Sequence, residues 1–129
     1  MTKRTTIKTD KAPKAVGPYS QAIVVGDLIF TAGQIPLDPE TGKLIGGTFQ
    51  DRVKRVLDNL DAILIEAGCS LSQAVKVTVF LTDLSRFEEL NDVYVEYFSD
   101  EPPARSTLQV SQLPLGTDVE IECVALRSK

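Results

Sequence analysis

The sequence contains no histidine and no tryptophan, and it has only two cysteines among its 129 residues. Without histidine the chain cannot form a Ser-His or Cys-His nucleophile pair, and it offers no imidazole ligand to a metal ion. Any acid–base chemistry must therefore use Glu, Asp, Lys, Tyr, Cys or water. Cys69 and Cys123 form no Cys-x-x-Cys pair, which argues against a zinc site or redox motif and favours two small buried side chains.

Long apolar runs are also missing from the sequence. None reaches the ~20 residues of a membrane span, and residues 1–4 lead into polar sequence rather than the apolar core of a signal peptide. We therefore expect a cytoplasmic protein that does not associate with membranes. The formal net charge of −4 argues against broad nucleic-acid binding, which needs a basic face. The length suits a single domain, and we expect that domain to span 1–129.

Short apolar segments predict the strands. Residues 22–25 and 28–31 are separated by Gly26-Asp27, which predicts a β-hairpin with a type II′ turn because glycine comes first. Residues 74–81 are rich in β-branched side chains and predict a further strand. One face of that strand would carry Val75, Val77, Val79 and Leu81, and the other face Thr78 and Phe80.

Two segments have the spacing of helices. Apolar residues recur at helical intervals over 49–67, with Thr48 as the candidate N-cap and Gly68 placed for a left-handed C-terminal cap. A second helix is expected from Ser85, the N-cap of a capping box, to about Phe98.

The last two strands are predicted at 106–110 and 117–126. The order hairpin, helix, strand, helix and two strands predicts an α+β fold, in which both helices cover one face of a single mixed sheet. Val124 and Leu126 would share a strand face with Glu120 on the side that no helix covers. We expect a second chain to cover these apolar residues, so the sequence predicts an oligomer.

Arg105, in the segment 103–106, is the strongest candidate for chemistry, and the acidic strand with Glu120 and Glu122 follows it. A planar guanidinium can hold a small carboxylate by two parallel hydrogen bonds. A half-buried glutamate can carry a proton at neutral pH if its pKa is raised. Together they predict a pocket for a small carboxylic acid with an acid–base group inside it. Taken singly, Arg105 also fits a surface salt bridge, and the glutamates fit a solvent-facing side of a strand.

Two loop residues are further candidates. Tyr19 follows Gly17-Pro18, where an aromatic side chain also fits packing on the core. Gly33 comes at the end of a predicted strand, where it would let backbone N–H groups approach a ligand or would serve only as flexible backbone.

Five short motifs occur together and in order along the chain. They are Gly17-Pro18-Tyr19-Ser20-Gln21, Thr31-Ala32-Gly33-Gln34-Ile35-Pro36, Asn91-Asp92-Val93-Tyr94, Pro103-Ala104-Arg105-Ser106, and Leu113-Pro114 with Val119-Glu120-Ile121-Glu122. With these motifs the chain closely resembles the RidA (YjgF) family of reactive-intermediate deaminases over nearly its whole length. The resemblance implies a chorismate-mutase-like fold and a homotrimer with clefts between subunits. It also implies hydrolysis of 2-imino acids, such as 2-iminobutanoate and 2-iminopropanoate, to 2-keto acids and ammonia, with no cofactor and no metal.

The resemblance also implies roles for individual residues. Arg105 matches the arginine that holds the substrate carboxylate, and Glu120 matches the glutamate that positions or activates water. Tyr19 matches the aromatic wall of the cleft, Gly33 a backbone contact, and Asn91 a polar residue near the cleft. We expect substrate binding by these residues and catalysis by Arg105 and Glu120.

Two positions depart from the usual pattern of the family. Ala32 stands where a serine is common, so a hydroxyl is missing, and Thr107 stands at a substrate-binding position where a cysteine is common. A rival hypothesis is a non-enzymatic trimer that binds keto acids or other small metabolites and signals to a protein partner. Glu120 discriminates between the two, because binding alone needs no acid–base group. An RNA-cleaving translation inhibitor is the weakest of the three, given the net charge of −4 and the absent histidine.

Overall fold

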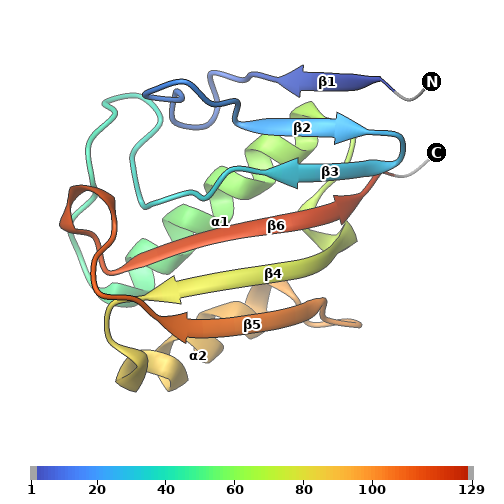
Figure 1. The fold of residues 1–129 in the computed structure, drawn as a ribbon. Coiled ribbons are helices and arrows are strands. Elements are labelled where there is room, and N and C mark those ends of the chain that lie inside the picture. Colours follow the sequence, from blue (N-terminus) through green and yellow to red (C-terminus); the bar gives the residue numbers. More distant parts are fainter. Residues whose placement is uncertain (1–2, 128–129) are drawn as a thin grey trace.

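The computed structural model describes residues 3–127, which form a six-stranded sheet in the order β1-β2-β3-β6-β4-β5 (Figure 1). The strands are β1 (Arg4–Ile7), β2 (Ala22–Val25), β3 (Leu28–Thr31), β4 (Ala74–Leu81), β5 (Ala104–Gln109) and β6 (Val119–Leu126). The helices are α1 (Phe49–Glu66) and α2 (Phe87–Tyr97), and short 3₁₀ turns lie at Leu71–Gln73, Leu84–Arg86 and Pro114–Gly116. Neighbouring strands are antiparallel except β4 and β5, which α2 connects because a parallel pair requires a crossover.

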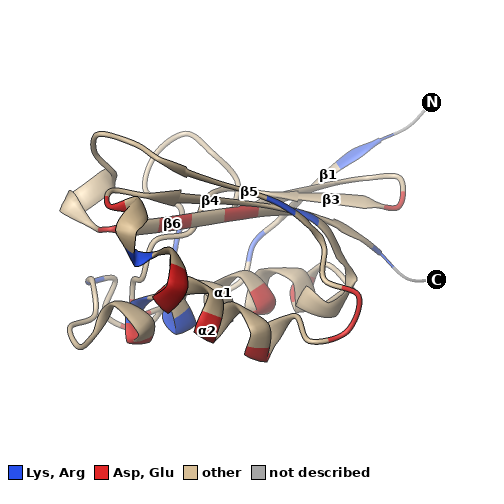
Figure 2. Cartoon of the chain, turned by 90° about the horizontal axis from the view of Figure 1, so that it is seen from below, with Lys and Arg blue, Asp and Glu red and all other residues tan. Residues whose placement is uncertain are grey.

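Both helices lie on the same face of the sheet, as the edge-on view shows (Figure 2). The apolar stripe of α1 is buried, and it consists of Phe49, Val53, Val56, Leu57, Leu60, Ile63 and Leu64. The central strand β6 buries its odd-numbered side chains, which are Val119, Ile121, Cys123 and Ala125. The predicted α+β arrangement is therefore confirmed. Within residues 3–127, no helix combines the length and the apolar character needed to cross a membrane.

The local signals for the hairpin and for α1 are also confirmed. β2 and β3 meet at Gly26, whose φ of +59° is the left-handed value that a glycine-first turn requires. At the start of α1, the Asp51 N–H donates to the Thr48 hydroxyl at 3.1 Å, and the Thr48 N–H donates to the Asp51 carboxylate at 3.0 Å. After the helix, Gly68 has a φ of +88° and ends the last turn.

The predicted start of the second helix is wrong. Ser85 lies inside the 3₁₀ turn Leu84–Arg86, and the cap is Asp83, whose carboxylate accepts from the Ser85 N–H at 3.0 Å and from its hydroxyl at 2.6 Å. The α-helical part therefore begins at Phe87. A serine hydroxyl that donates to a neighbouring carboxylate does not cap the helix, so the capping-box pattern misleads here.

The strands also differ from expectation in three places. Val75 does not join the apolar face of β4, because the pairing with β6 shifts register between Ala74 and Lys76 and leaves Val75 exposed. The edge strand β1 was not predicted, since its exposed polar residues carry no alternation of apolar side chains. The strands expected at 106–110 and 117–126 are present with shifted ends, as β5 and β6.

The face of the sheet opposite the helices carries exposed apolar side chains. Phe30 is 44% exposed, and Leu28, Leu108 and Leu126 are similarly open. Their strands pair in a continuous sheet, so these side chains share one broad surface on which neither α1 nor α2 lies (Figure 2). The sequence anticipated this uncovered face from the alternation along β6.

Candidate functional site

Glu120 lies on the uncovered face of β6, directly beside Gly33. An isolated antiparallel bridge holds the two segments together, with the Gln34 N–H donating to the Ile121 carbonyl at 2.9 Å and the reverse bond at 3.1 Å. A Cβ atom on Gly33 would lie 2.8 Å from Cδ of Glu120 and would clash with its Oε2. The missing side chain of Gly33 thus makes room for the carboxyl group of Glu120 in its present position.

Glu120 and Gly33 line a hollow of about 520 Å³. Besides Glu120, the lining residues come from three segments, 13–19, 32–42 and 114–115. Figure 1 shows these loops near the end of the sheet where β3 ends and β6 begins. Tyr19 lines the hollow as well, and its hydroxyl accepts from the Val16 N–H at 3.3 Å. The structure thus brings together three of the predicted site residues, Tyr19, Gly33 and Glu120.

The environment of Glu120 changes its acidity. Burial raises the pKa of its carboxyl group above the usual value, and repulsion from Glu122 on the same strand face raises it further. A carboxylate with a raised pKa is a stronger base than an ordinary glutamate, so Glu120 is suited to exchanging a proton with water.

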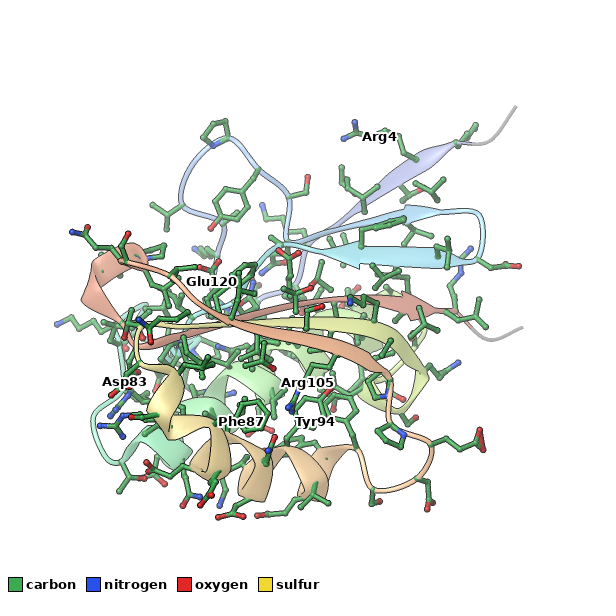
Figure 3. The ribbon with its side chains drawn as sticks, turned by 60° about the horizontal axis from the view of Figure 1, so that its bottom comes forward. Arg4, Asp83, Phe87, Tyr94, Arg105 and Glu120 are labelled. Atoms are coloured by element: carbon green, nitrogen blue, oxygen red, sulfur yellow. The ribbon has the colours of Figure 1, made fainter. Side chains whose placement is uncertain are left out.

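Arg105 has a different environment. Its guanidinium carbon lies 4.6 Å from the ring centre of Tyr94 and 5.3 Å from that of Phe87, both on α2 (Figure 3). Arg105 forms no salt bridge with any of residues 3–127, so the surface ion pair considered above is not what holds it. Two aromatic faces hold the cation instead, which leaves its N–H groups available to an anion.

Two buried hydroxyl groups, without hydrogen-bond partners in the described part of the chain, lie near Arg105. Thr107 lies two residues further along β5 and therefore on the same face. Its hydroxyl oxygen and that of Tyr94 are buried, and neither has a hydrogen-bond partner within residues 3–127. Asn91 follows Phe87 by one helical turn and precedes Tyr94 by another, so it shares their stripe of α2. The two hydroxyl oxygens are enclosed by the chain itself, so they lie in the interior beside the arginine rather than on its exposed side.

The phenol of Tyr94 stays protonated beside Arg105. Burial raises the pKa of Tyr94 to about 12, although the nearby charge of Arg105 lowers it in part. A protonated phenol can donate a hydrogen bond as well as accept one. Phe87 and Tyr94 were not among the predicted site residues, and Tyr94 was named only within the motif Asn91-Asp92-Val93-Tyr94. Their spacing of seven residues, which places both on one stripe of the helix, was the one signal that they act as a pair.

Arg105 and Glu120 lie on opposite faces of the sheet. Arg105 pairs with Val77, which is fully buried under the helices, whereas Glu120 pairs with Phe80 on the other side of the same strand. Side chains alternate along a strand and paired residues point the same way, so the two groups are separated by the sheet. Figure 3 shows Arg105 beside α2 and Glu120 beyond the strands. A single chain therefore does not bring both residues into one pocket.

The two cysteines are not among the residues grouped at Glu120 or at Arg105. Cys69 and Cys123 are both buried. Burial raises the pKa of Cys69, and it raises the pKa of Cys123 to about 12. Both thiols are therefore neutral at physiological pH and poorly suited to act as nucleophiles. No cluster of three potential metal ligands is found in the part of the chain that the structure describes.

We predict that Gly33→Ala displaces the carboxyl group of Glu120, because the added methyl group would occupy its position. The NMR titration of Glu120 should then shift toward the ordinary pKa of a glutamate as the carboxyl group moves into solvent. Gly46→Ala is the control, since a Cβ atom there meets nothing within 4 Å. An unchanged Glu120 titration in the Gly33 variant would show that the carboxyl group is not held by this contact.

The chain is thus a small α+β protein with both helices on one face of a mixed sheet, a carboxyl group in a hollow and an arginine on an aromatic support. The sequence profile described as Endoribonuclease L-PSP matches residues 9–127. The chain therefore belongs to this family, and its resemblance to the RidA (YjgF) proteins is confirmed.

Three relatives illustrate the match. A RutC family protein of Pyrococcus abyssi is 54% identical over 121 residues, which cover 94% of this chain and 95% of that protein. The human 2-iminobutanoate/2-iminopropanoate deaminase is 44% identical over 124 residues, covering 96% and 90%. The crystal structure of Escherichia coli TdcF with bound serine has a TM-score of 0.90 and 41% identity, covering 96% of this chain and 99% of that one.

Proposed function

We propose that this protein hydrolyses 2-imino acids to 2-keto acids and ammonia, at a site that two copies of the chain complete. The observation that carries the proposal is the separation of an acid–base group, Glu120, from an arginine without a carboxylate partner, Arg105, by the sheet. A relative at 44% identity is named for this reaction with 2-iminobutanoate and 2-iminopropanoate. We propose the cytoplasm as its location.

The assembly that we propose is a homotrimer. The uncovered apolar face with Phe30 and Leu126 would be buried between copies, since a monomer would leave it in water. β5 is an edge strand, so Arg105 lies at the border of its own chain. In a closed ring every chain contacts the next copy through the same edge. The surface around Arg105 of one chain can then face the Glu120 hollow of its neighbour.

Arg105 would hold the substrate carboxylate through two parallel hydrogen bonds. The rings of Phe87 and Tyr94 fix the plane of the guanidinium before the substrate arrives, so less freedom is lost on binding. Thr107 and Asn91 would complete the contacts, because Thr107 follows Arg105 on the same face of β5 and Asn91 shares the stripe of α2 with Phe87 and Tyr94. The clamp orients the imine carbon toward the neighbouring chain.

Glu120 would carry out the proton transfers. Water attacks the carbon of the protonated imine, a C–O bond forms, and the carboxylate takes a proton from the water. It then returns this proton to the nitrogen of the carbinolamine, the C–N bond breaks to release ammonia, and the hydroxyl group gives its proton to that ammonia as the ketone forms. The sum is one iminium ion and one water giving one 2-keto acid and one ammonium ion. No metal, cofactor or nucleophilic side chain enters this balance.

The test is the release of ammonia and keto acid from 2-iminopropanoate and 2-iminobutanoate that an amino acid oxidase generates in the assay. The protein should raise the rate above the spontaneous hydrolysis, and light scattering should give the mass of three chains. A rate equal to that of the solvent alone would refute the deaminase activity.

A second candidate is a trimer that binds keto acids without turning them over. The arginine on its aromatic support favours this function as much as the first, since it recognises a carboxylate in either case. Only the catalytic function needs a carboxyl group of raised pKa, so Glu120 distinguishes the two. RNA cleavage is the weakest candidate, because the chain has no histidine and a net charge of −4.

A further inference from the structure

The hollow beside Glu120 has an apolar rim that the proposed reaction does not use. Val16 is 83% exposed and Leu115 is 70% exposed, and both line the hollow together with Tyr19. Exposed apolar side chains that gather around a concave surface mark sites where a ligand removes them from water. Among the lining residues only Lys14 and Glu120 are charged.

Leu115 is held at this rim in an unfavourable backbone conformation. Its φ of 57° and ψ of 19° are left-handed, which is uncommon for a leucine, and it lies in the 3₁₀ turn Pro114–Gly116. A left-handed leucine that is mostly exposed gains little from the core to offset the strain. Strained residues gather at sites that bind ligands, where the conformation directs a side chain toward the ligand.

One wall of the hollow is anchored to α1 by hydrogen bonds. Ile35 and Leu37 line it, and the buried side chain of Asn59 on α1 donates to the carbonyl group of Leu37 at 3.0 Å. Asn59 in turn accepts from Arg55 at 3.2 Å, which fixes the orientation of its amide. The wall is therefore formed before any ligand binds, and this favours a defined apolar group over a flexible one.

We propose that this hollow holds the side chain of the imino acid, and that the protein prefers 2-imino acids with branched aliphatic or aromatic side chains over 2-iminopropanoate. The inference rests on the proposed function, which places the reacting carbon at Glu120 and hence the substrate side chain in the space around it. In the single chain, before a neighbour faces it, the hollow has a volume of about 520 Å³, which is far more than a methyl group fills. This volume falls within the range of about 300–1,000 Å³ typical of pockets for larger ligands.

The experiment compares imines that an amino acid oxidase forms from leucine, phenylalanine and alanine. We expect the wild-type kcat/KM for the leucine-derived imine to exceed that for the alanine-derived imine by about 10-fold or more, since each methylene in an apolar pocket contributes about 10–200-fold. In Leu115→Asn this ratio should fall to about 3 or less, because the rim loses its apolar contact. Asparagine tolerates a left-handed φ, so the turn should be kept.

Two controls accompany the test. Leu115→Met keeps an apolar side chain of similar size, so the ratio should stay near the wild-type value. Ile65→Asn changes an exposed side chain on α1 that does not line the hollow, and it should leave both rates unchanged. A loss of preference in the Ile65 variant would show that the effect of Leu115 is not local.

Binding separates this inference from the proposed function. Calorimetry compares 4-methyl-2-oxopentanoate with pyruvate, and the larger keto acid should bind more tightly to the wild type than to Leu115→Asn. Tighter binding without turnover of any imine would refute the deaminase and support the assignment of the hollow. Turnover with equal kcat/KM for the small and the large imine would overturn the inference and leave the deaminase standing. Dissociation of the assembly in Leu115→Asn would show that the rim contacts a neighbouring copy, which also overturns it.

Discussion

Replacing Glu120 by glutamine is expected to lower kcat by about 10²–10⁴-fold, the range that a general acid–base group contributes. Glutamine keeps the size and much of the hydrogen bonding of glutamate, but it cannot exchange a proton with water. Binding of a keto-acid product should change far less, because Arg105 still holds the carboxylate. Rapid-quench or coupled ammonia assays measure the first effect, and calorimetry measures the second. A Glu120→Gln protein with nearly wild-type turnover would make the binding function the leading candidate.

The same substitution should leave a signature in stability. The pKa of Glu120 is raised in the folded chain, so the folded state binds its proton more tightly than the unfolded state. As pH rises through the ordinary glutamate pKa toward the raised value, the wild type therefore loses stability. Glutamine carries no charge, so Glu120→Gln should melt at a higher temperature than the wild type at neutral pH. This gain in melting temperature should disappear at a pH below the pKa of Glu120 in both the folded and the unfolded state.

Glu122→Gln is the matched control for this prediction. Glu122 shares the strand face but lies one pleat repeat further along, roughly 6–7 Å away. Its repulsion is one cause of the raised pKa of Glu120, so removing it should lower that pKa. The acidic limb of the pH profile of kcat/KM should move to lower pH. The maximal rate should fall much less than in Glu120→Gln. An unmoved limb would mean that Glu120 is not the group that titrates.

Arg105→Ala should also be inactive, and mixing it with Glu120→Gln should restore activity. Loss of one partner of a desolvated charge pair costs roughly 2–5 kcal/mol. In the proposed ring of three chains, each site would take Arg105 from one copy and Glu120 from the next. When the two variants assemble at random from equal amounts, about one site in four receives both native residues, by the symmetry of the ring. Co-expressed variants should therefore show about a quarter of the wild-type activity per site.

Two outcomes would contradict this prediction. If mixed assemblies stay inactive although light scattering confirms that the chains exchange, both residues must act within one chain, against the geometry of the sheet. A Glu120→Gln and Arg105→Ala double variant supplies the baseline, because no site in its assemblies can be complete. Arg105→Lys should fail badly as well, since a point charge lacks the two parallel donors of a guanidinium.

The elements that the sequence predicted best depend on local signals. The helix cap formed by Thr48 and Asp51 and the hairpin turn at Gly26 each involve only a few neighbouring residues. The local sequence is therefore enough to predict both structures. Ser85 has the same pattern as Thr48 and does not cap a helix, because Asp83 competes for its hydroxyl group. The edge strand β1 has no apolar alternation, and only its pairing with β2 defines it.

The sequence predicted the residues of the candidate site and not their arrangement in the fold. Arg105 and Glu120 were recognisable from their residue types and their neighbours in sequence. The face on which Arg105 lies depends on the parallel register of β5 with β4, which is set across the α2 crossover and leaves no trace in the spacing of the motif. The aromatic support from Phe87 and Tyr94 likewise forms only when that helix packs beside β5.

The sheet between Glu120 and Arg105 has a consequence for how activity depends on the amount of protein. A single folded chain would contain no complete site. It would contribute Glu120 to one site and Arg105 to another. Dilution below the dissociation constant of the assembly should then abolish turnover without unfolding anything. A chain that carries both Arg105→Ala and Glu120→Gln would inactivate two of the three sites in a ring whose other two chains are wild type. One defective chain in three would therefore remove two thirds of the activity of the ring.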